Sequence, residues 1–538
     1  MEPSARGEKL SAMEPSARGE KLSAWAAEVG RRRSADAELT FEDSSSMLRD
    51  LMTRGLVKMT DLRDDPEWFF EAHRIVAAHG DDLGSGFWTR FTVQFNLFAG
   101  TVLAAGSPSH VEQLRAMQAA GELGCFALTE KFAGVSSGMV VETVAAFDAA
   151  SRTFVLRSPN EGAVKNWISQ GFCADKSVVI ADLQLEDGVS QGAHAFLIDF
   201  RVPRGSGAGG GASSQHGAAA KQLVAGVRLA DMGRKTTAND LDNAWIAFDG
   251  VRVPESCLLD RYSYVDAAGR RMVHRQHAGR QQGQGAAQEH AAQERAAQEH
   301  AAQERAAAHA AVRGMMMIGQ RLFSGRVAVA QAALVFGRHL FAKCRGYTDA
   351  KLCWAPRGVR PPLSMLPQLS SLYEEAERAF DYAEQYTARC EADYCRCVRA
   401  DELPDARLQE AIAVAKVRAV ETVIQLCFRL KQAVGSHALM LGSGFEHLDA
   451  MQIAKFAEGE SFVLMQKLAR DTVKRGAVAG AGAEERAIVA ELHGARAAEW
   501  LAKAAKVYLL AELVMDRNME RLCGAPPPRG IARPWARL

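Results

Sequence analysis

The residue of this chain best suited to proton transfer is Glu458, which lies beside Gly459 and just before a segment whose apolar side chains recur at helical spacing over 461–475. Ser461 is expected to cap this helix, and Gly459 to allow a tight turn before it. The arrangement aims the Glu458 carboxylate off the helix end, where it could act as a general base. An acid near a helix N-terminus also favours the macrodipole, so the position alone leaves a structural role open.

Two upstream stretches carry groups that could hold a flat polar ring. Residues 124–130 (Gly-Cys-Phe-Ala-Leu-Thr-Glu) precede loosely spaced glycines, a pattern that matches neither a Walker loop nor a dinucleotide fingerprint. The Thr129 hydroxyl could approach such a ring, although an ordinary β-turn explains the same residues. On a predicted strand, Trp167 and Ser169 point to one face, so an indole could pack a cofactor and a hydroxyl could bond its edge. Plain sheets show this spacing too.

Composition excludes several classes of protein. The chain has 538 residues, 48% hydrophobic and 24% charged, which is typical of a globular protein with a large core. A net charge of +1 indicates no global field toward nucleic acid or an anionic membrane. Ten scattered cysteines without a secretory leader indicate free thiols in a reducing compartment, and their spacing predicts no metal site. We expect no membrane span, because no apolar run approaches the roughly 20 residues required.

The pattern along the chain predicts an α+β fold in which helices, a β unit and further helices follow one another. Residues 1–12 recur unchanged at 13–24 and are expected to be disordered or weakly helical. The five-residue repeat at 286–305 advances about 140° per copy, so it forms no apolar stripe and is predicted to carry no chemistry. The expected units are a duplicated disordered N-terminus (1–36), an N-terminal helical domain (37–122), a central antiparallel β-barrel-like domain (123–265), a low-complexity insertion (266–312), a C-terminal helical bundle (313–480), and a terminal helix and tail (481–538).

Four stretches, taken in order, resemble the acyl-CoA oxidase and dehydrogenase superfamily, and most closely its peroxisomal oxidases. They are Thr129-Glu130, Lys165-x-Trp167-Ile168-Ser169, Leu241-Asp242-Asn243 leading to Val251-Arg252-Val253-Pro254, and Phe456-Ala457-Glu458-Gly459-Glu460. The resemblance covers roughly residues 92–475. It implies an acyl-CoA dehydrogenase-like fold, FAD bound noncovalently between the β unit and the bundle, and an acyl-CoA substrate dehydrogenated between Cα and Cβ.

The resemblance also implies roles for single residues. Glu458 matches the position of the base, Thr129 and Ser169 match positions that bond the flavin, and Trp167 packs near its ring. A base and a flavin must flank the acyl chain on opposite sides, because one takes the α proton while the other accepts the electrons leaving Cβ.

Two further positions imply a homodimer. Arg345 stands where related proteins use an arginine on the cofactor phosphates of a partner subunit. Gly435 opens the stretch Gly435-Ser436-His437-Ala438, where the family has a glycine-rich loop that lets the partner's FAD approach. Because this chain has serine and histidine there, close contact with the cofactor is an open point.

Three features favour an oxidase, which passes electrons to molecular oxygen and gives hydrogen peroxide. Glu-Gly-Glu at 458–460 is similar to the oxidase form, whereas dehydrogenases usually carry Glu-Gly-Thr, and residues 146–148 with 158–159 also resemble oxidases. The ending Ala536-Arg537-Leu538, after a proline stretch at 526–528 expected to be flexible, matches an address read by the peroxisomal import receptor. The alternatives are a dehydrogenase that uses an electron-transferring flavoprotein, and a non-catalytic relative that acts as a binding protein.

Overall fold

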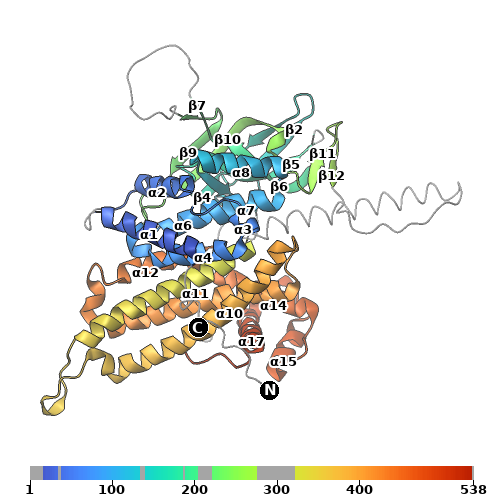
Figure 1. Ribbon diagram of the computed structural model, residues 1–538. Helices are drawn as coiled ribbons and strands as arrows, with labels where there is room; N and C mark the ends of the chain where they lie inside the picture. Colours follow the sequence, from blue (N-terminus) through green and yellow to red (C-terminus); the bar gives the residue numbers. More distant parts are fainter. Residues whose placement is uncertain are drawn as a thin grey trace.

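The computed structural model describes residues 16–33, 38–133, 140–185, 188–203, 221–274 and 322–535. The N-terminal helices lie between a β unit and a C-terminal helical bundle (Figure 1). This arrangement confirms the predicted α+β fold class. The repeat at 286–305, the first copy of the N-terminal duplication and the last three residues lie outside the described ranges.

The N-terminal helices begin and end at residues with recognisable capping chemistry. A capping box formed by Thr40 and Asp43 starts α2, and the Asp65 side chain caps α4, whose first residue is proline. Gly121, at φ 64°, ends α8 in the left-handed region. The helices are α1 (Ala17–Arg32), α2 (Phe41–Thr53), α3 (Asp61–Asp64), α4 (Pro66–Ala78), α5 (Gly80–Leu83), α6 (Phe87–Thr92), the π-helical η1 (Val93–Phe98), α7 (Ala99–Ala105) and α8 (Pro108–Ala120).

The expectation of disorder at the N-terminus is wrong for the second copy of the duplication. Residues 17–32 form α1, which buries Leu22 and Trp25 against the neighbouring helices. The Trp25 indole N–H donates to Asp50 Oδ2 at 2.8 Å, and Arg18 pairs with Asp61 at 2.8 Å. Leu22 of this copy and Trp25 directly after it therefore have tertiary partners, which periodicity within the copy alone did not indicate.

The β unit contains a mixed sheet in which most neighbours are antiparallel. The strand order is β1-β5-β2-β3-β10-β4, with β6 on β5 and β9 on β10, and β5 is parallel to both β1 and β2. Phe147, Phe154 and Phe196 pack ring to ring inside it. The strands are β1 (Gly124–Ala127), β2 (Val144–Asp148), β3 (Thr153–Arg157), β4 (Lys165–Ser169), β5 (Lys176–Gln184), β6 (Ser190–Asp199), β7 (Arg201–Pro203), β8 (Lys221–Leu223), β9 (Val227–Asp231), β10 (Asn243–Pro254), β11 (Ser263–Val265) and β12 (Met272–His274).

Long helices build the C-terminal bundle. The unit 481–538, expected to hold a terminal helix and a tail, contains the three helices α15, α16 and α17, with Gly494 at φ 75° between the first two. The elements are the helix Leu322–Ala350, α10 (Pro367–Arg399), α11 (Ala406–Ala433), η5 (Gly435–Leu439), η6 (Phe445–His447), α12 (Leu448–Met451), α13 (Ile453–Phe456), α14 (Ser461–Arg475), α15 (Ala483–Leu492), α16 (Ala497–Ala502) and α17 (Ala504–Cys523), with the short 3-10 turns η2 (Glu255–Cys257), η3 (Pro356–Gly358) and η4 (Leu363–Met365) elsewhere in the chain.

The first helix of the bundle, Leu322–Ala350, is long and apolar enough to cross a membrane by length and composition. The sequence expectation that no run reaches this length is therefore wrong. Of its most apolar window, 61% is buried inside the protein, with Val327, Leu334 and Leu340 in the core. A core helix of a bundle has the same character.

The segment after α17 packs against the bundle instead of forming the flexible stretch expected around 526–528. Ala532 is buried, its N–H donates to Thr422 Oγ1 at 2.9 Å, and its carbonyl accepts from Arg418. The Trp535 N–H donates to Glu512 Oε1 at 3.0 Å. Hydrogen bonds to the bundle therefore hold the chain as far as Trp535.

Candidate active site

The loop that carries Glu458 joins α13 to α14 and has a strained backbone. Glu458 has φ 57° and Gly459 has φ 101°, so two consecutive residues lie in the positive-φ region. The helix cap expected at Ser461 is instead Glu460, whose Oε2 accepts from the N–H groups of Phe462 at 2.8 Å and Val463 at 3.1 Å. Of the two carboxylates, that of Glu460 is therefore occupied in capping α14.

Two buried cations hold the backbone of this loop. Lys416 of α11 donates from Nζ to the carbonyls of Lys455 at 2.7 Å and Gly459 at 2.9 Å. Arg326 donates from Nε to the Glu458 carbonyl at 2.9 Å. Burial lowers the pKa of Lys416 to about 7 and that of Arg326 to about 10, the latter against the opposing attraction of Glu458. The carbonyls on both sides of the base are thus fixed from two different helices.

The Glu458 carboxylate lies against the N-terminal helices. Its Oε1 accepts from Nδ2 of Asn96 at 3.3 Å, and Asn96 is fully buried in η1. Asn96 Oδ1 in turn accepts from the Ser324 hydroxyl at 2.6 Å. A Cβ at Gly325 would overlap the carboxyl group of Glu458, so the absence of a side chain at 325 makes the room in which the carboxylate lies.

The same turn of η1 connects Glu458 to the β unit. Gln94, two residues before Asn96, accepts at Oε1 from the Gly124 N–H and from Nε2 of Gln170, both at 2.8 Å. Gln170 directly follows β4 and also donates to the Gly124 carbonyl at 2.6 Å. One helical turn therefore contacts Glu458 on the bundle side and the ends of β1 and β4 on the other.

Thr129 and β4, which the sequence assigns to one site, are neighbours in the structure. The Asn166 N–H donates to the Thr129 carbonyl at 2.9 Å. Beneath them, the fully buried Lys165 donates to Glu130 Oε1 at 2.8 Å, to the Leu128 carbonyl and to the Ile180 carbonyl. Burial lowers the pKa of Lys165 to about 8, against the opposing effect of Glu130. The buried pair fixes the Thr129 segment to the sheet.

A β-bulge turns Trp167 outward. The pairing of β4 with β10 shifts register between Ala244 and Ile246, which face Ile168 and Lys165, so β4 has one extra residue here. Trp167 adopts φ 57° and its side chain is 58% exposed. Because a bulge breaks the alternation of a strand, the expectation that Trp167 and Ser169 share a face by simple alternation does not apply here. Ser169 Oγ accepts from Asn243 Nδ2 at 3.0 Å.

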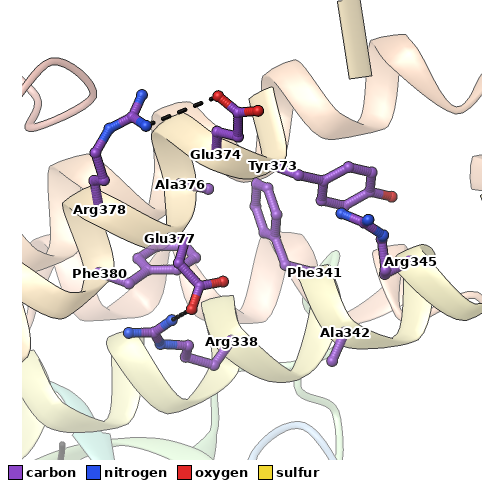
Figure 2. Close-up of a pocket in the computed structure, with 10 residues that line it drawn as sticks. All are labelled: Arg338, Phe341, Ala342, Arg345, Tyr373, Glu374, Ala376, Glu377, Arg378 and Phe380. Atoms are coloured by element: carbon purple, nitrogen blue, oxygen red, sulfur yellow. Dashed lines mark ion pairs between the residues drawn. The ribbon is translucent and has the colours of Figure 1, made fainter. Parts of the chain in front are cut away.

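Arg345 and Gly435 lie away from these residues. Arg345 is 20 residues beyond Gly325 on the same helix, which corresponds to roughly 30 Å. Its guanidinium lies 4.7 Å from the Tyr373 ring centre and pairs with Asp349 at 3.2 Å, in a groove of about 530 Å³ between this helix and α10 (Figure 2). Gly435, at φ 70°, follows α11 and borders open space. At that separation the Arg345 side chain cannot reach the Glu458 carboxylate of the same chain.

Sequence reasoning missed several residues that contact Glu458 or its loop, namely Asn96, Ser324, Gly325, Arg326 and Lys416. One signal was present for Lys416, because it lies in a mainly apolar segment of the predicted bundle, and a lysine buried in a bundle requires partners. No sequence signal distinguished Asn96, which is far from Glu458 in the chain.

Comparison with known proteins gives partial sequence matches and a nearly complete structural match. The chain is 31% identical over 228 residues to the peroxisomal acyl-coenzyme A oxidase 2 of Arabidopsis thaliana, a match that covers 40% of this chain and 30% of the relative. It is 31% identical over 174 residues to the human peroxisomal acyl-coenzyme A oxidase 3, a match that covers 32% of this chain and 23% of the relative. These matches span less than a third of either relative. No protein-family model matches the chain.

Among solved structures, acyl-CoA oxidase-2 of Caenorhabditis elegans has a TM-score of 0.68 at 17% identity, covering 94% of this chain and 75% of the other, and it is bound with FAD, ascaroside-CoA and ATP. Butyryl-CoA dehydrogenase of Megasphaera elsdenii has a TM-score of 0.56 at 15% identity, covering 86% and 99%. Both likenesses support the fold. Part of the chain is therefore similar in sequence to peroxisomal acyl-CoA oxidases, and its fold is that of the acyl-CoA oxidase and dehydrogenase superfamily. Members of this superfamily are flavoenzymes of fatty-acid oxidation, and the sequence relatives are oxidases.

Proposed function

We propose that this protein is a peroxisomal acyl-CoA oxidase, which converts acyl-CoA to trans-2-enoyl-CoA with FAD and passes the electrons to oxygen to give hydrogen peroxide. The observation that carries the proposal is the position of Glu458. Its carboxylate is held on a backbone fixed by Lys416 and Arg326, and it lies one helical turn of η1 from the end of β4. A base in this position could take the α proton of a thioester bound between the bundle and the β unit.

The residues near β4 are compatible with a flat aromatic cofactor. An indole that is 58% exposed on a bulged strand offers a surface for stacking, and Thr129 and Ser169 lie on or beside that strand. Trp167, Thr129 and Ser169 would hold FAD, and the bound group would supply the acceptor for the two electrons that leave the substrate. The described chain would provide the base, its orientation and the walls of the site.

A homodimer is part of the proposal. Leu439, Met440 and Leu441 follow Gly435 and are 80%, 64% and 90% exposed, and Phe456 beside the base loop is 58% exposed. Consecutive exposed apolar residues at this density are typical of an interface. A second copy seated there would also bring an Arg345 to the cofactor phosphates, as the superfamily resemblance implies. Import of this dimer into peroxisomes by the receptor for Ala536-Arg537-Leu538 is likewise a proposal from the sequence.

A dehydrogenase that reduces an electron-transferring flavoprotein is the second candidate, because the fold matches 99% of the butyryl-CoA dehydrogenase structure. The two differ in the electron acceptor. Purified protein is loaded with FAD and mixed anaerobically with butyryl-CoA, octanoyl-CoA and palmitoyl-CoA, and then with air. We expect flavin bleaching by at least one substrate and stoichiometric hydrogen peroxide on aeration. Bleaching without prompt reoxidation by air would instead support the dehydrogenase. Failure to take up FAD would favour the non-catalytic binding protein.

A further inference from the structure

Asn96 provides the contact through which the N-terminal helices reach the candidate base. It lies in the π-helical turn η1, is fully buried, and donates from Nδ2 to Glu458 Oε1 at 3.3 Å. The two residues are 362 positions apart in the chain. The contact therefore depends on the packing of the N-terminal helices against the bundle.

Ser324 determines which way the Asn96 carboxamide points. The Ser324 hydroxyl donates to Asn96 Oδ1 at 2.6 Å, so the carbonyl oxygen of the carboxamide faces Ser324 and its NH₂ group faces Glu458. The reversed orientation would place a carbonyl oxygen against the carboxylate. Tyr394 of α10 hydrogen-bonds Ser324 and extends this arrangement into the bundle.

Charged groups lie near Glu458 on the helix 322–350, on α11 and on its own loop, whereas η1 contributes none. Arg326 from the helix 322–350 and Lys416 from α11 are cations that donate hydrogen bonds to carbonyls of the loop backbone. Within the loop, Lys455 pairs with Glu421, and Glu460 caps α14. Asn96 differs from these groups because its neutral side chain donates directly to the Glu458 carboxylate.

We propose that Asn96 is a positioning residue for the Glu458 carboxylate, a role that rests on the proposed function of Glu458 as the base. Asn96 fixes the rotamer of Glu458 in the space over Gly325 and, by donating to the ionised form, keeps it ready to accept a proton. Hydrogen bonding to a carboxylate favours its charged form. The specificity of this arrangement lies in the neutral carboxamide, because an acid at 96 would repel the base.

The test uses the FAD-loaded protein and three variants. Asn96→Ala removes the donor, Asn96→Asp replaces it by an acid of the same shape, and Ser324→Ala releases the carboxamide. The matched control is Asn518→Ala, which removes another fully buried asparagine that donates to a glutamate, Glu410, elsewhere in the bundle. Flavin reduction by octanoyl-CoA is followed anaerobically across pH. A second readout needs no substrate: the infrared carboxylate band of Glu458, assigned by difference from Glu458→Gln, is measured as a function of pH and reports the protonation of Glu458.

We expect Asn96→Ala to slow reduction about tenfold and to move the acid limb of the pH profile upward by about one pH unit. Asn96→Asp is expected to move it further, because two nearby carboxylates cannot both ionise easily. Ser324→Ala should move it in the same direction by less, and Asn518→Ala not at all. An infrared titration of Glu458 that is the same in the wild type, Asn96→Ala and Asn96→Asp would overturn the proposal, as would an equal shift in Asn518→Ala.

Failure of the proposed function gives a different result. If wild-type protein binds FAD but no acyl-CoA bleaches it, the oxidase and dehydrogenase assignments both fail. The infrared titration still reports whether Asn96 controls the protonation of Glu458. Should Asn96→Ala not fold, Asn96→Asp and Ser324→Ala supply the same comparison.

Discussion

Glu458 and Trp167 both have φ 57°, yet their surroundings are opposite. The loop of Glu458 is held by Lys416 and Arg326, and its carboxylate contacts a fully buried asparagine. Trp167 is held by the pairing of a bulged strand, and 58% of its side chain is exposed. Each residue persists in a costly conformation because its neighbours determine it.

The candidate site has two sides that differ in how they are completed: the base side around Glu458 and the ring side around Trp167. The base side is completed within one chain, by the helix 322–350, α11 and η1. The ring side leaves an indole exposed, and the residues that the resemblance assigns to a partner's cofactor, Arg345 and Gly435, lie elsewhere on the surface. Substitutions on the base side should therefore change chemistry or stability, and substitutions on the ring side should change ligand affinity.

The largest effect is expected from the base itself. Glu458→Gln should reduce the rate of flavin bleaching by acyl-CoA by about 10³-fold while FAD stays bound, because the amide cannot accept the α proton. Glu460→Gln should be milder, since that residue caps α14 and its loss affects helix stability instead. Anaerobic stopped-flow absorbance measures both variants. A larger loss of rate in Glu460→Gln than in Glu458→Gln would show that Glu458 is not the base.

Filling the space over Gly325 tests whether the base side tolerates displacement. Gly325→Ala is expected to lower the rate of flavin reduction about 10- to 100-fold, because a Cβ there overlaps the Glu458 carboxyl group and must move it. FAD content, measured by absorbance, should be unchanged. Gly346→Ala on the same helix is the control, since no atom lies within 4 Å of a Cβ there. Equal rates in the two variants would show that the carboxylate position is not critical.

Lys416 gives the base side a distinctive dependence on pH. Its ammonium titrates near 10.5 in the unfolded chain, and burial lowers its pKa to about 7 in the folded protein. Between these values the unfolded chain binds more protons, so the Lys416 contribution to the free energy of unfolding rises with pH and is constant below about pH 7.

Chemical denaturation of the wild type and Lys416→Met measures this contribution. From pH 7 to about pH 9, the difference in free energy of unfolding should shift in favour of the wild type by about 2 kcal/mol. Lys431→Met, at a partly exposed position near the end of the same helix, controls for loss of a lysine as such. A pH-independent difference would mean that Lys416 does not titrate in this range.

The smallest effect on the folded protein is expected on the ring side. Trp167→Ala should change the free energy of unfolding by less than about 0.5 kcal/mol, because the side chain is largely exposed. FAD affinity should fall roughly fivefold through loss of stacking, and Trp167→Phe should retain most of it. Equilibrium titration of the apoprotein with FAD distinguishes these outcomes. Unchanged FAD affinity in Trp167→Ala would remove Trp167 from the proposed ring site.

Local patterns in the sequence predicted the fold class, because helical and β periodicities extend over long segments such as α11 and the strands of the β unit. They also brought Thr129 together with β4. They could not predict the helix α1, because its stability comes from packing against distant helices. They also could not predict the cap of α14, because the Glu460 carboxylate and the Ser461 hydroxyl are both suitable acceptors at that helix end. The roles of Asn96 and Gly325 could not be predicted for the same reason, because both residues act through contact with Glu458, which is more than a hundred positions away in the chain.

The π-helical turn at η1 limits how this helix can evolve. A π-helical turn differs from an α-helical one by a single added residue, and each residue rotates the helix by about 100°. Deleting Phe95, the residue between Gln94 and Asn96, would rotate these two side chains relative to one another by about 100°, so that both could no longer keep their contacts. Lineages that descend from this chain should therefore accumulate replacements in this turn while its length stays constant.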